Sequence, residues 1–389
     1  MSQGKLIRDR EMARVLAAMR FGAGDSVAEI AKLLKVSEKS VYKLRSEAID
    51  KKMLARADIF NPKDVPPGVL LAAECEVEKR RGSRDELLVR LRTALSIEAG
   101  FEVRVRICGS NPTLESRLSL TVIARNAAPY LKELLINRDV HTAAVAYGSA
   151  VRSLLVELRK ISEVPFRRAN PVTCVPLRGD AGLGAVDTPS VLAHYLCETL
   201  NGVDTDERHW RAPTATPPVL PDPRKFKLGG RVLAETLKTY LGLFPDGEEC
   251  FGEMGLIRRD VQLVVTSVGP PLPVSPITQW IFDLAGFDTR TLPLVGDVAG
   301  IPILDSRRDT EAQRASVTRF EEESLIGATS TTFRETISRG GRVVAVVFDD
   351  VTRARCLLEM VRKGMATDLL VDRRVAKEVD RLIKSDAAN

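Results

Sequence analysis

SVAEIAKLLKVSEKSVYKLRSEAIDKKML, residues 26–54, predicts two short helices joined by a tight turn. Ser26 and Glu29 form a capping-box pattern, in which each side chain satisfies a backbone donor of the other, so a helix begins there. Lys35 and Val36 form the turn, and Ser37 can cap the second helix. Apolar residues at helical spacing predict a core shared by the two helices: Val27, Ile30, Ala31, Leu34, Val41, Leu44 and Ala48. The stretch therefore predicts a helix-turn-helix.

The opposite face of the second helix carries polar and basic side chains that suit a DNA major groove. Lysine can donate to guanine acceptors or phosphates, hydroxyl groups can contact base edges, and a helix N-terminus favours a phosphate. We predict an interface with double-stranded DNA formed by Ser37, Lys39, Ser40, Tyr42, Lys43 and Ser46. The alternative is an ordinary helical hairpin with a solvated basic face. The turn spacing, the basic face and the terminal position favour DNA.

The segment before the helix-turn-helix predicts a supporting helix. Residues 8–19 place Met12, Val15, Leu16 and Met19 on one apolar stripe, and Gly22, Ala23 and Gly24 end the periodicity.

The charge of the chain is concentrated at this end. The net charge is +6, and residues 1–56 hold thirteen Lys or Arg against seven Asp or Glu, so this segment supplies the whole excess. Such an excess suits a polyanionic partner. The sequence lacks the apolar segment of a signal peptide and any 18-residue apolar run, so we expect a cytoplasmic protein without a membrane partner. Six scattered cysteines show no metal-ligand spacing, and we predict no metal or cofactor.

The length of 389 residues predicts a second, larger module. Proline, glycine and a charged run interrupt the apolar periodicity after the helix-turn-helix, so we divide the chain into a DNA-binding domain at 1–60, a linker at 61–84 and an effector domain at 85–389. The basic run at 78–86 could contact a partner, although a solvated helix face is the simpler interpretation. Leucines on both sides of this run could support a dimer.

The larger module alternates helical stretches with short apolar runs, at residues 101–108, 141–147, 171–177, 260–268 and 342–349. Continuous β-branched runs separated by amphipathic helices predict a mostly parallel sheet in a Rossmann-like α/β fold. Such sheets bind ligands beyond the carboxyl ends of their strands. Two turns there suit an anion: Gly148 and Ser149 at a helix N-terminus, and Arg178 with Gly179 in a glycine-rich loop. Each turn alone is equally compatible with a purely structural role.

The sequence resembles the SorC family of sugar-binding transcriptional regulators. Residues 26–54 resemble the family's helix-turn-helix, although Lys35 stands where the turn usually carries glycine. The resemblance continues through AAVAYGSAVRSLL (143–155), CVPLRGDAGLG (174–184), VTSVG (265–269), LVGDVAGIPILD (294–305) and LLVDRRVAKEV (369–379). It implies an effector domain resembling sugar-phosphate isomerases, with a closing strand and helix at the C-terminus.

The resemblance also implies an effector site. The residues at the matching positions are Gly148, Ser149, Arg178, Gly179, Gly269, Asp297, Thr352 and Arg353. Ala150 replaces a common hydroxyl, Ser190 replaces a usual Asn, and FDDVTRAR (348–355) lacks the ligand-facing Lys, with Thr352 or Arg353 as substitutes. Loss of a charged hydrogen bond costs about 1.5–3 kcal/mol, so we expect a changed, less anionic effector.

These features predict a non-enzymatic transcriptional regulator that binds a palindromic operator as a homodimer or homotetramer and responds to a sugar or sugar derivative. A sugar-phosphate-processing enzyme fused to a DNA-binding module is the alternative. Its candidate acids and bases are Asp180, Asp297, Asp349, Asp350, His141, His194 and His209, without a nucleophile–base pairing. A third possibility is a partner-binding protein whose N-terminal hairpin contacts protein. The proline-rich segment at 210–223 predicts a rigid surface loop.

Overall fold

The structure is a computed structural model of the 389-residue chain. It describes residues 10–22, 25–54, 86–109, 116–137, 140–161, 171–178, 188–202, 232, 235–236, 239, 245–252, 254–271, 279, 282–283, 287–324 and 327–388. The chain forms two compact units, Met1–Arg90 with Gly109–Asn126 and Leu91–Cys108 with Ala127–Asn389. The expected linker at 61–84, the proline-rich segment at 210–223 and Gly179 lie outside the described residues, so the division into 1–60, 61–84 and 85–389 stays a prediction.

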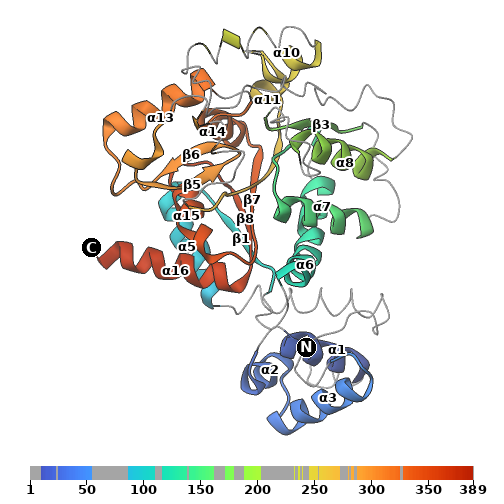
Figure 1. Ribbon diagram of the computed structural model, residues 1–389. Coiled ribbons are helices and arrows are strands. Elements are labelled where there is room, and N and C mark those ends of the chain that lie inside the picture. The colour runs from blue at the N-terminus through green and yellow to red at the C-terminus, as the bar shows by residue number, and fades with distance from the viewer. Residues whose placement is uncertain are drawn as a thin grey trace. The chain divides into compact units, whose positions relative to one another are not determined.

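The first unit contains a three-helix bundle, drawn in blue in Figure 1: α1 (Arg10–Gly22), α2 (Val27–Leu34) and α3 (Glu38–Asp50). Its buried core confirms the predicted inward faces of α2 and α3, with Val27 partly buried beside the others. The supporting helix ends at Gly22 as predicted, and Val15 and Leu16 are buried in the same core. The side chain of Met12 lies outside the described part of the chain. Phe21 is also buried in this core, so the apolar stripe of α1 continues past its predicted last residue, Met19.

The turn between α2 and α3 has the predicted caps. The Ser26 hydroxyl accepts from the Glu29 amide, and the Glu29 carboxylate accepts from the Ser26 amide at 2.9 Å, completing the capping box. The backbone of Lys35 adopts the left-handed conformation, with φ 56° and ψ 45°. A side chain in this region costs roughly 1–2 kcal/mol relative to a right-handed backbone. The turn therefore keeps a geometry that favours glycine although lysine occupies it.

The second unit is built on a six-stranded, fully parallel sheet, which confirms the predicted fold class. The strands are β1 (Arg104–Ile107), β2 (Thr142–Val145), β3 (Thr173–Pro176), β4 (Leu263–Ser267), β7 (Arg342–Val347) and β8 (Asp368–Val371). Their order is β1-β8-β7-β4-β2-β3. Five strands coincide with the five predicted apolar runs, and β8 is the closing strand that the resemblance implies. Every residue of β2, β4, β7 and β8 is buried, which explains why these strands are mostly apolar, and the buried Arg342 and Asp368 at the starts of β7 and β8 pair with each other.

Helices lie on both sides of the sheet (Figure 1). The helices after the bundle are α5 (Glu86–Ala99), α6 (Ser116–Asn137), α7 (Ser149–Ile161), α8 (Pro189–Asn201), α10 (Pro245–Phe251), α11 (Leu256–Arg259), α13 (Glu311–Ser324), α14 (Ser330–Ser338), α15 (Ala354–Arg362) and α16 (Arg373–Ala388). Two short 3₁₀ turns are η3 (Thr289–Thr291) and η4 (Val351–Arg353). Across the described parts of the chain, no helix has the length and apolar character needed to cross a bilayer.

A two-stranded antiparallel hairpin accompanies the sheet. Its strands are β5 (Leu294–Val298) and β6 (Ile301–Leu304), and the sequence did not predict them as a strand pair. Val298 pairs with Ile301, which leaves Ala299 and Gly300 as a two-residue turn with φ 50° and 84°. Positive φ at both central residues is the signature of a hairpin turn whose twist matches that of its strands. Alanine at position 299 is not a residue type that predicts such a turn.

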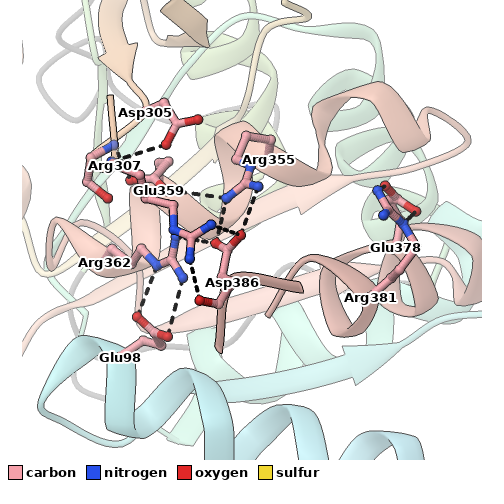
Figure 2. A network of polar contacts seen from close by, with 10 residues as sticks. Glu98, Asp305, Arg307, Arg355, Glu359, Arg362, Glu378, Arg381 and Asp386 are labelled. Carbon is pink, nitrogen blue, oxygen red and sulfur yellow. Dashed lines mark hydrogen bonds and ion pairs between the residues drawn. The ribbon is translucent and has the colours of Figure 1, made fainter. Parts of the chain in front are cut away.

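An ion-pair network fixes the C-terminal helix α16. Figure 2 shows the Asp386 carboxylate among the guanidinium groups of Arg307, Arg355 and Arg362, with ion-pair distances of 2.9, 2.6 and 2.7 Å. Arg362 also pairs with Glu98 of α5 at 2.9 Å and with the buried Glu359 at 2.8 Å. Three arginines on one carboxylate compensate its desolvation, so the network joins α5, α15 and α16.

Candidate functional site: a DNA-facing helix and an effector site

The predicted DNA face is a contiguous exposed surface of α3. Ser37 precedes the helix and Lys39, Ser40, Tyr42, Lys43 and Ser46 lie along it, all exposed. Tyr42 is 56% exposed, so its ring and hydroxyl are both available on this surface. Val41, Leu44 and Ala48 are buried on the opposite side. The structure thus brings all six predicted residues together on one face.

Ser37 combines two tasks at the start of α3. Its hydroxyl accepts from the Ser40 amide at 3.2 Å, and the hydroxyls of Ser37 and Ser40 are 2.9 Å apart. The cap fixes the first turn of α3, whose remaining amide donors are oriented outward at the positive end of the helix dipole. A phosphate can bind at such a helix end.

Two side chains hold the flanks of α3 against α1. Glu47 accepts hydrogen bonds from Arg10 and from the Arg14 Nε, the latter at 3.3 Å. The hydrogen bond from Arg10 is the largest influence on the carboxyl and keeps the pKa of Glu47 below its ordinary value. On another side, the guanidinium of Arg45 lies 5.4 Å from the ring centroid of Phe21, at the end of α1. These contacts fix the rotation of α3, and the sequence analysis did not identify them.

The candidate effector site lies where β2, β3 and β4 end. Gly148 follows β2 with φ 140°, and an added Cβ would lie 2.5 Å from the Ser267 Oγ at the end of β4. The Ser267 hydroxyl donates to the Tyr147 carbonyl at 3.3 Å. Ser149 is exposed and begins α7. Gly148 therefore permits the close approach of two strand ends, and Ser149 stands at a helix N-terminus.

Arg178 follows β3 and is buried, with 5% of its surface exposed. Its guanidinium lies 5.2 Å from the ring centroid of Tyr147 and donates to the Ala299 carbonyl at 3.3 Å. An added Cβ on Gly300 would lie 2.0 Å from the Arg178 Nη1. The turn of the β5–β6 hairpin therefore fits around this side chain.

Asp297 of β5 lies in the same place and is 1% exposed. Its Oδ2 accepts from the Gly300 amide at 2.9 Å and from the Tyr147 hydroxyl at 3.4 Å. An added Cβ on Gly269 would lie 1.9 Å from the Asp297 Oδ1, and the Gly269 amide donates to the Asp297 carbonyl at 2.6 Å. Gly269 thus makes room for the carboxylate. The structure thus brings Arg178, Gly269 and Asp297 close together, through the β5–β6 hairpin.

Tyr147 links these groups, and the sequence analysis did not include it among the site residues. Its ring contacts Arg178 and its hydroxyl donates to Asp297, so one side chain touches both charged groups. The sequence signal that could have identified Tyr147 is its position, as an aromatic residue directly before Gly148 at the end of a predicted strand.

The two predicted residues after β7 differ in their environment. The Arg353 Nη1 donates to the Val268 carbonyl at 3.0 Å, which brings this guanidinium to the end of β4, next to Gly269. The Thr352 hydroxyl is exposed and donates to Asp350 at 2.6 Å. Burial raises the pKa of Asp350, but hydrogen bonds from Thr352 and Arg353 outweigh burial and keep that pKa below its ordinary value. The Asp350 carboxylate therefore balances the positive charge of the Arg353 guanidinium.

Of the candidate acids and bases of an enzyme, Asp297 and Asp350 are among the effector-site contacts given above, and neither described histidine is. His141 is exposed and precedes β2, at the amino end of that strand, and His194 pairs with Glu198 of α8 at 3.2 Å. Asp180 and His209 lie outside the described residues. Groups of three or more His, Cys, Asp or Glu that could hold a metal ion are absent from the described residues.

Solved structures are similar to this chain in fold. A domain of a possible sugar-binding transcriptional regulator from Arthrobacter aurescens TC1 has a TM-score of 0.51 at 16% identity, covering 75% of this chain and 97% of that one. A transcriptional regulator from Streptococcus pneumoniae TIGR4 has a TM-score of 0.51 at 12% identity, covering 78% and 99%. A SorC family transcriptional regulator from Enterococcus faecalis has a TM-score of 0.50 at 15% identity, covering 75% and 99%.

No family model and no curated protein matches the sequence. The likeness therefore concerns the fold: the α/β architecture of this chain is that found in SorC family transcriptional regulators. The family resemblance expected from the sequence is confirmed at this level.

Proposed function

We propose that this protein is a DNA-binding transcriptional regulator whose affinity for its operator is controlled by a small carbohydrate-like effector. The observation that carries the proposal is α3, five of whose polar residues form, with the capping Ser37, one exposed face opposite a buried apolar face. A helix in the major groove needs such a division. The fold shared with solved transcriptional regulators supports regulation over catalysis.

The effector site suits hydroxyl groups better than a phosphate. Asp297 and Arg178 bind neighbouring backbone groups of one turn, the Gly300 amide and the Ala299 carbonyl, and Asp350 pairs with Arg353 at 2.8 Å, so both cations share the site with carboxylates. Carboxylate and carbonyl oxygens accept from sugar hydroxyls, and guanidinium groups donate to them. A phosphate would compete with these carboxylates. We therefore propose a sugar or sugar alcohol with little negative charge, bound near Gly148, Ser149, Arg178, Gly179, Gly269, Asp297, Thr352 and Arg353.

The protein would act as a symmetric homodimer or homotetramer. Symmetric oligomers bind two half-sites related by a two-fold axis, so the operator would be palindromic. The effector would shift the population between oligomers with high and low operator affinity. In this arrangement, residues 1–60 would bind DNA, and residues 85–389 would bind the effector and form the oligomer. Residues 61–84 would link these two domains.

Selection of bound fragments from a library of genomic DNA tests the proposal. The full-length protein should enrich fragments that share a palindromic sequence. Lys39→Ala, Tyr42→Ala and Lys43→Ala, combined in one variant, should abolish the enrichment without changing the oligomer size. Lys32→Ala, which removes an exposed lysine from α2, is the control and should keep it. Equal enrichment by the triple variant would contradict the DNA assignment.

A further inference from the structure

The flank of α3 carries an acidic side chain beside the proposed DNA-facing surface. Glu47 lies one helical turn after Lys43, and residues four apart are neighbours on a helix surface. When a helix lies in the major groove, its flanks face the phosphates of the two strands. An isolated carboxylate there would repel DNA.

Glu47 is held by two arginines of α1 whose exposure differs. Arg14 is buried, with 10% of its side chain exposed, and contacts the Oε2 through both Nε and Nη2 at 3.3 Å. Arg10 pairs with the Oε1, and 58% of its side chain is exposed. Only Arg10 of these two has the exposure that a phosphate contact requires. The carboxylate therefore competes with solvent-borne anions for the Arg10 guanidinium.

We propose that Glu47 limits the sequence-independent affinity of this protein for DNA by engaging Arg10, which would otherwise contact a backbone phosphate. The proposal rests on the proposed DNA-binding function. Glu47 is a positioning residue here, because it acts on DNA through Arg10. Its charge also leaves the trio of Arg10, Arg14 and Glu47 with a net charge of +1 instead of +2.

The expected change in DNA affinity follows from the exposed ion pair between Arg10 and Glu47. Exposed ion pairs are weak, so release of Arg10 changes affinity by a small factor, about three-fold at low salt. Each additional phosphate contact makes the dependence of log K on log salt steeper by about 0.9. A loss of stability in α1 and α3 would only weaken binding. The salt slope therefore separates the proposed role from a structural one.

The test measures binding of the full-length protein to a fluorescein-labelled duplex of mixed sequence over a range of KCl concentrations. Glu47→Gln should bind about three-fold more tightly at low salt, with a slope about 0.9 steeper than that of the wild type. Glu47→Asp, which keeps the charge, should behave like the wild type. Arg10→Gln combined with Glu47→Gln should lose the gain, because the released cation is absent.

Three results would overturn the proposal. An unchanged slope in Glu47→Gln, with a wild type that binds the duplex in a salt-dependent manner, would refute the role of Glu47 and leave DNA binding intact. Persistence of the gain in the double variant would show that Arg10 is not the released group. A wild type without salt-dependent duplex binding would refute the proposed function itself, and the role of Glu47 with it.

Discussion

The guanidinium of Arg178 lies over the ring of Tyr147, 5.2 Å from its centroid, at the carboxyl ends of β3 and β2. The two residues are joined to the β5–β6 hairpin by separate hydrogen bonds, Arg178 to the Ala299 carbonyl and Tyr147 to Asp297. Three segments distant in sequence therefore meet through one cation–ring contact and two hydrogen bonds. A ligand that engages either side chain would act on the hairpin as well.

Arg178→Ala should remove effector binding. In a thermal-shift screen of sugars, sugar alcohols and their phosphates, a ligand that binds only the native state raises the melting temperature by mass action. The variant should lose every shift found with the wild type, because it lacks the buried guanidinium. Arg290→Ala removes an exposed arginine paired with Asp288 and serves as the control. If Arg178→Ala kept all shifts, the effector site would be elsewhere.

Gly300→Ala should destabilise the second unit more than Gly340→Ala. Both glycines have positive φ, 84° and 81°, so the backbone strain of an alanine is similar at the two positions. A Cβ at Gly300 would meet the Arg178 Nη1 at 2.0 Å, whereas nothing lies within 4 Å at Gly340. Displacement of a buried side chain adds about 1–3 kcal/mol. Urea unfolding measures the difference, and equal costs would show that Arg178 moves aside freely.

Lys35→Gly should stabilise the helical bundle. Glycine removes the cost of a side chain at φ 56° and ψ 45°, and we expect a gain of about 1 kcal/mol in the free energy of unfolding. Lys51→Gly is the matched control, because Lys51 also follows a helix but has φ −87°. That variant should be neutral or destabilising. Unfolding followed by circular dichroism distinguishes the two, and a loss of stability in Lys35→Gly would contradict the argument.

Stability should decrease in acid through Asp386. Burial raises the pKa of its carboxyl, but hydrogen bonds from Arg355 and Arg362 outweigh burial and hold the pKa below its ordinary value. A carboxyl with a lowered folded-state pKa stabilises the protein above its unfolded-state pKa of about 4. This contribution is lost as the pH falls through the folded-state pKa.

Asp386→Asn should therefore cost about 2 kcal/mol in the free energy of unfolding at neutral pH and progressively less in acid. Denaturant unfolding over a pH series measures this difference. Glu322→Gln, which removes an exposed carboxylate from α13, should show neither the cost nor the pH dependence. A difference between wild type and Asp386→Asn that does not change with pH would exclude the charge as the cause.

Local patterns were sufficient where a local interaction decides the structure. The capping box of Ser26 and Glu29, the cap at Ser37 and the inward face of α3 depend on residues within a few positions of one another. The fully buried strands could also be predicted, because strands covered on both faces are mostly apolar. For this reason the helix-turn-helix and five of the six sheet strands could be predicted.

The β5–β6 hairpin and the contacts of the effector site could not be predicted in this way. Ala299 adopts a left-handed backbone conformation, which alanine does not favour. In the same turn, the Gly300 amide donates to Asp297, and Arg178 donates to the Ala299 carbonyl. Arg178 and Ala299 are 121 positions apart, and Tyr147 and Asp297 are 150 apart. The sequence by itself determined the elements and the chemistry at their ends. Tertiary structure decided which charged groups meet, because the order of parallel strands brings distant loops to one edge of the sheet.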